Sequence, residues 1–557
     1  MKRKLYIILL IIAFFAFGGT LCAQTSTQGT DFWLSFGKNR HSTSSEINMQ
    51  VRIVTNQAAT VTFTYTNSGT TEIYNVPAGS IETITLNNTQ KSRVFSGATG
   101  RTSNSLHIES TTPISVYALN QNTNTTDATN VLPVTSLGTD YYHISYLACY
   151  QAPTVYDDGY TVIATENNTI IYDEGTPITT LQKGQVYSAY YSNTDITGKH
   201  ITSNNPIAYF VTNGGVFIPV NLTNGSDCLF QQLLPVNVWG NNFLVPVTHR
   251  GTERVRIVAS QDGTIITQTG GVIKTDNGGF SQNILTLNRG QFVELEIYLA
   301  SHGCYISANK PVGVGAYLAG EYYYDHSPDL IVKKGDPALT WVPPIEQSIN
   351  GALIAPFVPQ GNTNLDEHYA LIVTSTATKD QTTVAVGASA PVAVSGGSWR
   401  DNSASNYSFY SLQLSNSSSD SYFFANPHGL VVLGYGIGNT ESYYYLSGAA
   451  ARNLNAAFYI NDIHYQDLDG SIICDTVADF RSVIQYAMST TPGYLRWYVD
   501  SVEQVAVTDT LEWSRTLSVG EHNVYIDVLD MSNDTITLSA TFTVGLPYYS
   551  TDRKSVV

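Results

Sequence analysis

Val51-Arg52-Ile53-Val54 and Thr60-Val61-Thr62-Phe63 are two short runs of β-branched and apolar residues separated by a turn. Such residues fit the half-buried surface of a pleated sheet, so the pair predicts a β-hairpin. The turns between later copies contain Asn167-Asn168 and Asp262-Gly263, which are common hairpin residues. The pattern returns three more times, at 161–164 with 169–172, at 255–258 with 264–267, and at 370–373 with 383–386.

Two other elements recur together with this pair of runs. Gly29-Thr30-Asp31-Phe32-Trp33 returns as Gly138-Thr139-Asp140-Tyr141-Tyr142, with weaker copies at 240–243 and 351–354. A closing element places a proline between two apolar runs, and we expect a turn there because proline lacks an N–H group. Its prolines are Pro113, Pro206, Pro311 and Pro427.

The recurrence predicts an all-β fold in which 24–452 forms four tandem β-sandwich-like repeats of about 100 residues each. A β-propeller of paired blades is the alternative, with about 45 residues in each blade. The pattern changes near Asn453, and 453–545 predicts a C-terminal immunoglobulin-like or PKD-type β-sandwich, with Trp497 as a core anchor on a central strand. Residues 546–557 are expected to be an unstructured tail.

The N-terminus predicts export. A basic start at 2–4 is followed by an apolar run at 5–17 and a small residue, Ala23, which is the order of a signal peptide over 1–23. An uncleaved anchor and a lipoprotein acylated on Cys22 are alternatives, but the run is short for a membrane span. No later stretch is long and apolar enough to cross a membrane, so the mature protein is expected to be secreted or held at the cell surface.

The charge balance limits the classes of partner. Loss of 1–23 removes three basic residues and leaves 24 basic against 44 acidic ones, a net charge of −20. Nucleic acid and anionic membranes are therefore excluded as expected partners. Cys149, Cys228, Cys304 and Cys474 show no metal-ligand spacing, and no cofactor or metal is expected. A disulfide between Cys149 and Cys228 is predicted because both lie in one repeat, with buried free thiols as the alternative.

Catalytic motifs are absent from the sequence. There is no Gly-x-Ser-x-Gly, His-Glu-x-x-His or phosphate-binding Gly-x-x-x-x-Gly-Lys segment, so an enzyme is not expected. The alternative is a glycan-active hydrolase, for which Glu321, Asp325 and Asp329 are the local carboxylate candidates. His107 and His200 occupy equivalent strand positions and are expected to face outward, without a carboxylate companion.

Clusters of tyrosine predict where binding occurs. Consecutive side chains of a strand point to opposite faces, so Tyr443-Tyr444-Tyr445 should expose at least one ring. Exposed tyrosine gives rigid contact area with a polar end. The segment 335–347 is stiffened by three prolines and carries a tryptophan, which makes it a suitable ligand contact. The predicted binding residues are Tyr322, Tyr323, Tyr324, Asp325, Asp336 and Trp341.

The same elements resemble a known family. Gly29 to Trp33, Ser203 to Ala208, Ala308 to Val312 and Gly335 to Gln347 together resemble the N-terminal domain family of the immunoglobulin G Fc-binding protein, which also occurs in secreted bacterial proteins. The resemblance covers about 28–450. It implies an extracellular adhesion or recognition role toward a host or matrix glycoprotein or glycan, and a structural surface spacer is the third alternative. No family residue contacts are carried over.

Overall fold

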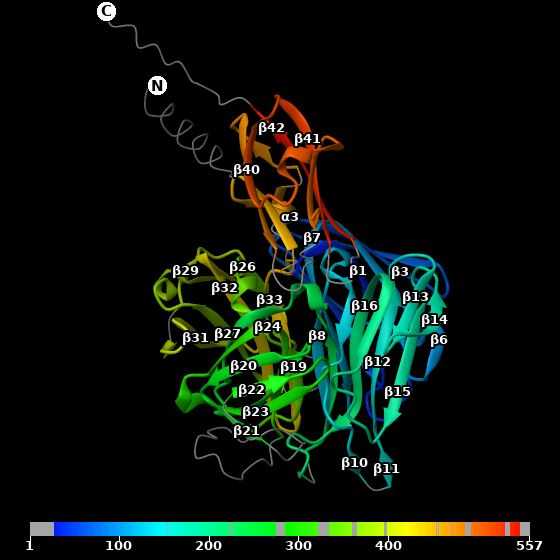
Figure 1. Cartoon of the computed structure of the whole chain (residues 1–557). Helices are drawn as coiled ribbons and strands as arrows, with labels where there is room; N and C mark the ends of the chain where they lie inside the picture. The colour runs from blue at the N-terminus through cyan, green and yellow to red at the C-terminus, as the bar shows by residue number, and fades with distance from the viewer. Residues whose placement is uncertain are drawn as a thin grey trace, which may run out of the picture. The chain divides into compact units, whose positions relative to one another are not determined.

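The computed structural model describes residues 27–545, apart from 152, 223–224, 275–283, 321–333, 359–364, 395–397, 453, 455, 469, 485–491 and 530–534. It divides the chain into two compact units, of which one is Ser26–Arg452 and the other contains Asn453–Val557. Both units consist almost entirely of strands (Figure 1), which confirms the all-β prediction.

Four sheets of the first unit share one topology, and each is organised around one long strand. In the first sheet this strand is β7 (Leu106–Asn122). Its first half pairs with β1 (Gly29–Leu34) and β3 (Ala59–Tyr65), and its second half pairs with β2 (Asn48–Val54) and β8 (Thr125–Val131). Each long strand therefore belongs to two layers, which are joined where it bends.

The other three sheets repeat this arrangement. Their long strands are β16 (His200–Val216), β24 (Cys304–Leu318) and β32 (Tyr422–Gly438). The first half of β16 pairs with β9 (Gly138–Tyr142) and β13 (Thr169–Asp173), that of β24 with β18 (Gly240–Val245) and β20 (Thr264–Thr269), and that of β32 with β26 (Ile349–Ile354) and β28 (Thr383–Val386). The second half of β16 pairs with β12 (Asp157–Ala164) and β17 (Asp227–Gln232), that of β24 with β19 (Thr252–Ala259) and β25 (Ala338–Trp341), and that of β32 with β27 (Leu365–Ser375) and β33 (Glu441–Gly448).

Further strands extend each sheet outward on both sides, and a few helical turns join the strands. These outer strands are β4 (Thr70–Val76), β5 (Ile81–Thr85), β6 (Gly100–Thr102), β14 (Thr176–Leu181), β15 (Val186–Ser192), β21 (Gly271–Lys274), β22 (Ile284–Leu287), β23 (Phe292–Tyr298), β29 (Val392–Ala393), β30 (Arg400–Asn402) and β31 (Tyr407–Leu414). A separate two-stranded hairpin consists of β10 (Tyr150–Gln151) and β11 (Thr154–Val155). The helical pieces are α2 (Asn88–Val94), η1 (Val134–Ser136), η2 (Val236–Val238), η3 (Leu299–Ser301), η4 (Ile345–Gln347) and η5 (Lys379–Gln381).

The expected turn at the recurring prolines is wrong, because each long strand continues through its proline. The register breaks there instead. Asp31 on β1 faces Glu109 on β7, but Gly29 already faces Ile114, so the residues around Pro113 form a bulge. A bulge bends a strand and accepts a residue that cannot donate to the ladder. The bend carries β7 from one layer into the next, and the other three long strands break register at the same place.

The predicted hairpins are also wrong in their pairing. β2 and β3 both lie beside β7, but in different layers, and they do not pair with each other. The connection between them crosses from one layer to the other. Its counterparts still contain tight turns, since Asn168 has φ 59° and Gly263 has φ 65°. The turn residues predicted from the sequence are confirmed, while the partner of each strand is set by the bend in the long strand.

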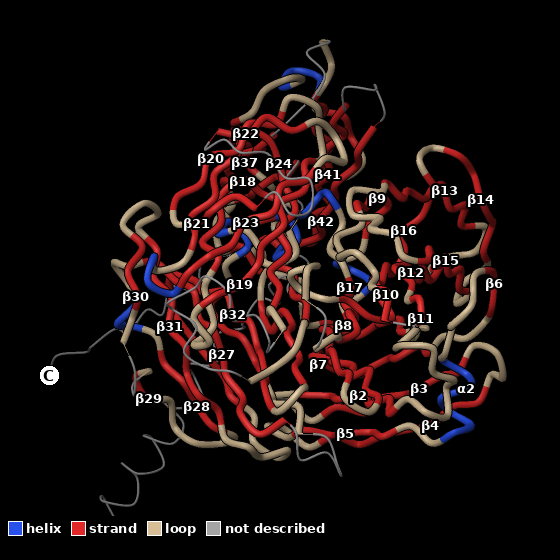
Figure 2. Tube along the Cα trace, turned by 90° about the horizontal axis from the view of Figure 1, so that it is seen from below, coloured by secondary structure: helices blue, strands red, loops and turns tan. Residues whose placement is uncertain are grey.

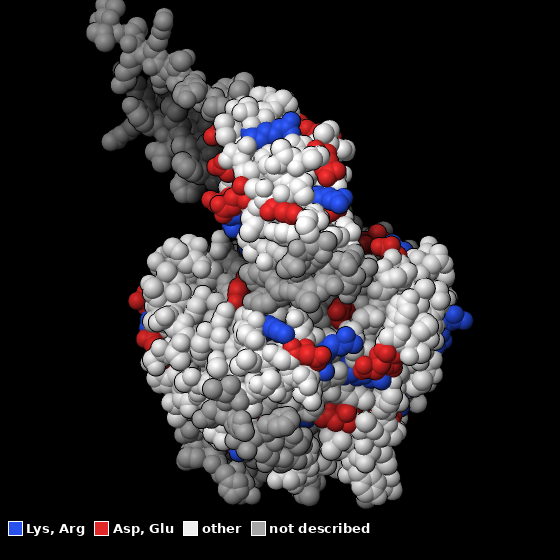
Figure 3. All heavy atoms as spheres, viewed as in Figure 1, with Lys and Arg blue, Asp and Glu red and all other residues white. Residues whose placement is uncertain are grey.

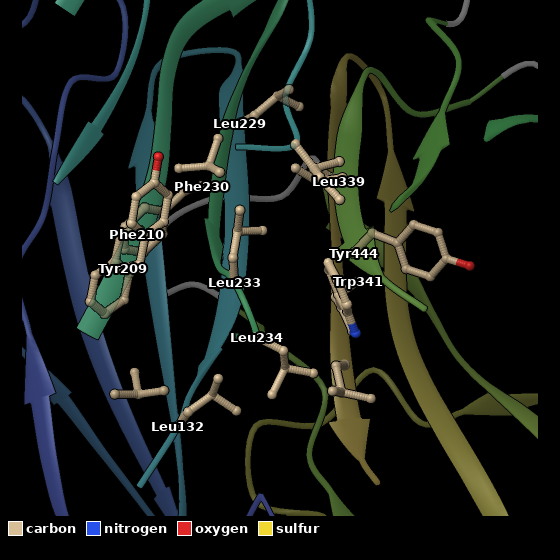
Figure 4. Packing of buried hydrophobic residues seen from close by; sticks show 14 of the residues in the cluster. Leu132, Tyr209, Phe210, Leu229, Phe230, Leu233, Leu234, Leu339, Trp341 and Tyr444 are labelled. Atoms are coloured by element: carbon tan, nitrogen blue, oxygen red, sulfur yellow. The ribbon is translucent and has the colours of Figure 1, made fainter. Parts of the chain in front are cut away.

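The inner strands β8, β17, β25 and β33 contact one another, and Figure 2 shows β8 and β17 side by side near the middle of the unit. Gln231 on β17 donates hydrogen bonds to the carbonyls of Ala128 (3.1 Å), Leu339 (2.8 Å) and Tyr444 (3.2 Å), one on each of the other inner strands. Figure 4 shows buried apolar side chains of the same region, among them Phe230 of β17, Leu339 and Trp341 of β25, and Tyr444 of β33. The amide of one glutamine thus connects all four sheets.

The second unit consists of two sheets around its own core. Trp497 is fully buried and contacts the rings of Phe458 and Phe480 from the opposite sheet, which confirms it as a core anchor. One sheet contains β34 (Ala456–Ile460), β35 (Ile463–His464), β37 (Val477–Ile484) and β40 (Glu512–Thr516); the other contains β36 (Ile472–Ile473), β38 (Leu495–Val499), β39 (Val502–Glu503), β41 (Gly520–Leu529) and β42 (Thr535–Val544), with α3 (Tyr465–Leu468) and η6 (Val505–Val507) in the connections.

Candidate functional site

Loops from different sheets gather where the long strands end, at residues 122, 216, 318 and 438. We call this the turn end. Backbone hydrogen bonds hold the loops together: the Arg40 amide donates to the Gly214 carbonyl, the Cys149 amide to the Gly215 carbonyl and the Gly320 amide to the Ile218 carbonyl, each over 2.8 Å. Segments of three sheets therefore meet here with fixed backbones.

The turn end contains a pocket with a volume of about 350 Å³. Tyr150 stands at its edge and is 58% exposed. The nearby hairpin also exposes Val155. Most of the other described residues that line it have apolar side chains, and none of them is charged. The lining residues are Leu147, Ala148, Cys149, Tyr150, Gln151, Asn193, Phe217, Val220 and Leu222.

Cys149 lines this pocket as an unreactive thiol. Burial raises its pKa to about 12, so the sulfur keeps its proton at neutral pH. A thiol must lose its proton to act as a nucleophile, and enzymes lower the pKa to achieve this. The predicted Cys149–Cys228 disulfide is not formed in this structure, where both cysteines are free thiols, and it stays a prediction. Cys228 lies on β17 with its sulfur 3.9 Å from the Asn120 carbonyl, whereas Cys149 belongs to the pocket wall.

A grouping of His143, Ser145 and Asp158 superficially suggests a catalytic triad. Ser145 Oγ donates to Asp158 Oδ1 (2.7 Å), and His143 Nε2 lies 3.2 Å from the same oxygen. In a working triad the imidazole lies between the hydroxyl and the carboxylate, so that it can accept the serine proton. Here the carboxylate lies between them, and all three side chains are fully buried. The group connects loop and strand and does not form a nucleophile.

Buried carboxylates lie beneath the turn end. Asp127 accepts hydrogen bonds from the amides of Phe230 (3.0 Å), Leu339 (3.3 Å) and Tyr444 (3.3 Å), and burial raises its pKa well above the ordinary value. Burial also raises the pKa of Asp227. These groups hold the starts of the inner strands. Among the residues that the structure describes, no group of three or more His, Cys, Asp or Glu could hold a metal ion.

The predicted binding residues fall into two groups. Tyr322 to Asp325, together with Glu321 and Asp329, lie outside the described residues. The flanks of that segment are fixed at the turn end, because the Gly335 amide donates to the Gly438 carbonyl (2.8 Å) and Lys334 Nζ lies 2.7 Å from Glu367 Oε1. Gly320, on the other side, adjoins Leu222 of the pocket.

Asp336 and Trp341 are both buried, with 2% and 1% of their surfaces exposed. The Trp341 ring lies 5.6 Å from the Trp239 ring in the shared core. The Asp336 amide donates a hydrogen bond to the Ser442 hydroxyl (2.9 Å). Neither side chain is open to direct contact with a ligand in this structure. The expectation that Tyr443-Tyr444-Tyr445 exposes a ring is wrong, since neighbouring strands cover both faces of β33.

Sequence reasoning missed the pocket and the partners of two histidines. The pocket comes from loops at 147–151 and 217–222, which show no recurrent motif. The sequence offered one signal for this pocket, which is the aromatic residue Tyr150 in a segment outside the recurrent elements. His107 and His200 are largely buried against carboxylates, so the expectation of outward-facing histidines without such companions is wrong.

The first unit is thus an all-β unit of four related sheets with a loop-lined pocket at one end. The chain belongs to the IgGFc binding protein family, whose model matches residues 127–435. The human IgGFc-binding protein is 28% identical over 227 residues, which are 38% of this chain and 4% of the human protein. The chain therefore spans a small part of that relative's length. The recognition made from the recurrent motifs is confirmed.

Comparison with solved structures adds little. A Ca²⁺-stabilised adhesin with which an Antarctic bacterium binds ice covers 93% of this chain and 100% of its own, at 9% identity and a TM-score of 0.11. A tetra-tandem repeat from the extending region of a large adhesion protein covers 91% and 98%, at 11% identity and the same TM-score. Scores this low carry no argument. No helix among the described residues has the length and hydropathy to cross a membrane.

Proposed function

We propose that this chain is an exported recognition protein whose turn end binds an extracellular protein or glycoprotein. The family match supports a binding role. The human relative is named for binding IgG Fc, which makes Fc the first ligand to test. Export rests on the signal-peptide pattern of 1–23, and N-terminal sequencing of the natural product should begin near Gln24. A chain that retains Met1 would overturn the export proposal.

The observation that carries the proposal is an exposed aromatic residue at the edge of an apolar pocket. Tyr150 exposes more than half of its surface beside that pocket. Tyrosine at the mouth of a preformed pocket is typical of binding hot spots. The segment with Tyr322, Tyr323, Tyr324 and Asp325 begins one residue after Gly320, whose amide is bound to the pocket loop. We therefore propose that these residues contribute to the same surface.

The charges on the face drawn in Figure 3 fit recognition by shape more than capture by a charged patch. Figure 3 shows Lys, Arg, Asp and Glu side chains scattered in mixed signs over the face in view. Single-sign patches are what steer a strongly charged ligand. Affinity is therefore expected to depend on aromatic and apolar contacts and to change little with salt.

A panel of immobilised extracellular ligands tests the proposal. It should include IgG Fc, mucin and a glycan array, probed with the purified mature chain. Replacing Tyr322, Tyr323 and Tyr324 with serine should weaken binding by roughly 2 kcal/mol or more, as for aromatic hot spots. A control with Tyr498→Ser and Tyr525→Ser removes two stacked tyrosines of the other unit and should bind normally. The triple variant must keep the circular dichroism spectrum of the parent chain.

The outcomes separate the alternatives. Binding that survives the triple change places the site elsewhere. Release of products from mucin or glycans would favour the hydrolase, in which Glu321, Asp325 and Asp329 would be replaced next. Absence of any ligand across the panel would favour a structural spacer.

A further inference from the structure

The pocket walls are built from two loops that pack against each other. One contributes Leu147, Ala148 and Cys149, and the other contributes Phe217, Val220 and Leu222. Their backbones are joined where the Cys149 amide donates to the Gly215 carbonyl and where Ala148 forms a β-bridge with Val216. The second loop is held in turn by Gly320. Such a pocket is preformed, so a ligand loses little affinity to ordering it.

A neighbouring sheet fixes the start of the first loop. Arg256 on β19 donates to the Ser145 carbonyl (2.9 Å), and the Tyr317 hydroxyl on β24 donates to the same oxygen (2.7 Å). Arg256 is itself buried and paired with Asp195 and Glu294 at 2.7 and 3.0 Å. The loop that forms one wall is therefore clamped by a buried charge network, which keeps the pocket open without a ligand.

The chemistry of the walls selects the occupant. Among the described lining residues, an ionised ligand group would find no opposite charge to replace its lost hydration, which is costly. The polar side chains are the neutral amides of Gln151 and Asn193, both exposed at the mouth. They can accept or donate one or two hydrogen bonds at the edge of a ligand. A pocket of this volume is large enough for a flat ring system.

We propose that this pocket is an anchor site for an uncharged aromatic side chain, tryptophan or tyrosine, of a protein ligand. The apolar walls would contact the ring, Tyr150 would cover it from the edge, and the amides would meet its N–H or O–H. This site deepens the proposed function and rests on it, because the partner is taken to be a protein.

The direct test uses N-acetyl-L-tryptophanamide as a probe, with saturation-transfer NMR on the full mature chain. We expect a ring-proton signal that is absent for N-acetyl-L-lysinamide. Leu222→Trp fills the pocket from its own wall and should abolish the signal. Ile73→Trp adds the same side chain at an exposed position on β4 and should leave it unchanged. Circular dichroism must show that both variants fold.

A second variant keeps the test decisive if Leu222→Trp fails to fold. Val220→Trp lies on the same loop, is partly exposed, and should also remove the signal. The proposal is overturned if the tryptophan probe gives no signal, if the lysine probe gives an equal one, or if a folded pocket-filling variant still binds. Failure of the pocket proposal can be told apart from failure of the proposed function. The ligand panel can identify a partner that never enters the pocket, and the tryptophan probe can bind the pocket when no member of the panel binds the chain.

Discussion

His107 Nε2 lies 2.8 Å from Asp31 Oδ1, and the His107 ring stacks on Trp33 at a centroid distance of 4.0 Å. The second sheet repeats the arrangement. There, His200 Nε2 lies 2.7 Å from Asp140 Oδ1 and stacks on Tyr142 at 4.4 Å. The Gly-Thr-Asp-aromatic element and the histidine of the long strand thus form one interacting unit across adjacent strands, which explains why they recur together.

Replacing His107 with alanine should lower the free energy of unfolding by about 1–2 kcal/mol, because it removes the stack on Trp33 and the partly exposed hydrogen bond with Asp31. Thermal unfolding followed by tryptophan fluorescence measures the change. His428→Ala, at an exposed position of β32, is the matched control and should have little effect. An equal loss in both variants would show that the stack with Trp33 contributes nothing specific.

Gln231→Leu should destabilise the first unit by about 1–3 kcal/mol. Leucine has a similar volume, but it leaves the carbonyls of Ala128, Leu339 and Tyr444 without this donor in a buried position. Urea unfolding of the full chain, compared with the exposed control Gln57→Leu, measures the cost. An unchanged midpoint would mean that the inner strands do not depend on this amide.

Glu253 predicts a specific pH dependence of stability. It is fully buried, and burial raises its pKa to about 7 from an ordinary value of 4.5. Between these values the folded protein keeps a proton that the unfolded chain has lost. The stabilising contribution of Glu253 is therefore complete below about pH 4.5 and is lost as pH rises to about 7, by up to roughly 3 kcal/mol.

Glu253→Gln should remove this dependence, since glutamine stays neutral and can still accept the hydrogen bond from the Thr248 amide. The variant should match the parent chain near pH 4.5 and unfold at a higher temperature at pH 8. Thermal unfolding between pH 4 and 8 measures both curves. Parallel curves for the two proteins would contradict a buried, titrating Glu253.

Local patterns predicted the strands well but not their neighbours. Alternation in Val51 to Val54 identifies β2, yet nothing in that run indicates that its partners are β5 and β7 and not β3. Pairing is non-local and depends here on the bulge at Pro113. The same limit explains Tyr444. A run of tyrosines shows that both faces of the strand carry rings, whereas their burial depends on strands of other sheets that contact β33, such as β8 and β25.

The candidate site was predicted only in part, for a related reason. Motifs drew attention to 335–347, where recurrence reflects packing, so Trp341 lies in the core. The pocket comes from loops that differ between the sheets and that meet through apolar packing and through backbone hydrogen bonds such as that between Cys149 and Gly215. A sequence read by periodicity emphasises repeated residues, while a binding surface on repeated sheets is made by the residues that vary.

The four cysteines of 24–557 give the last prediction. Cys474 is exposed, whereas Cys149, Cys228 and Cys304 are buried free thiols. Burial raises the pKa of the Cys149 and Cys304 thiols to about 12 and that of Cys228 well above its usual value, so none of the three forms a thiolate at neutral pH. The native protein at pH 8 should therefore release one equivalent of chromophore rapidly from a disulfide reagent, and unfolding in guanidinium should reveal three more. Cys474→Ser should abolish the fast phase while leaving the slow one. A contrary result would be that the unfolded protein lacks two of these thiols until a reducing agent is added. That result would show that a disulfide forms in the natural protein, and peptide mapping would then decide whether it joins Cys149 to Cys228.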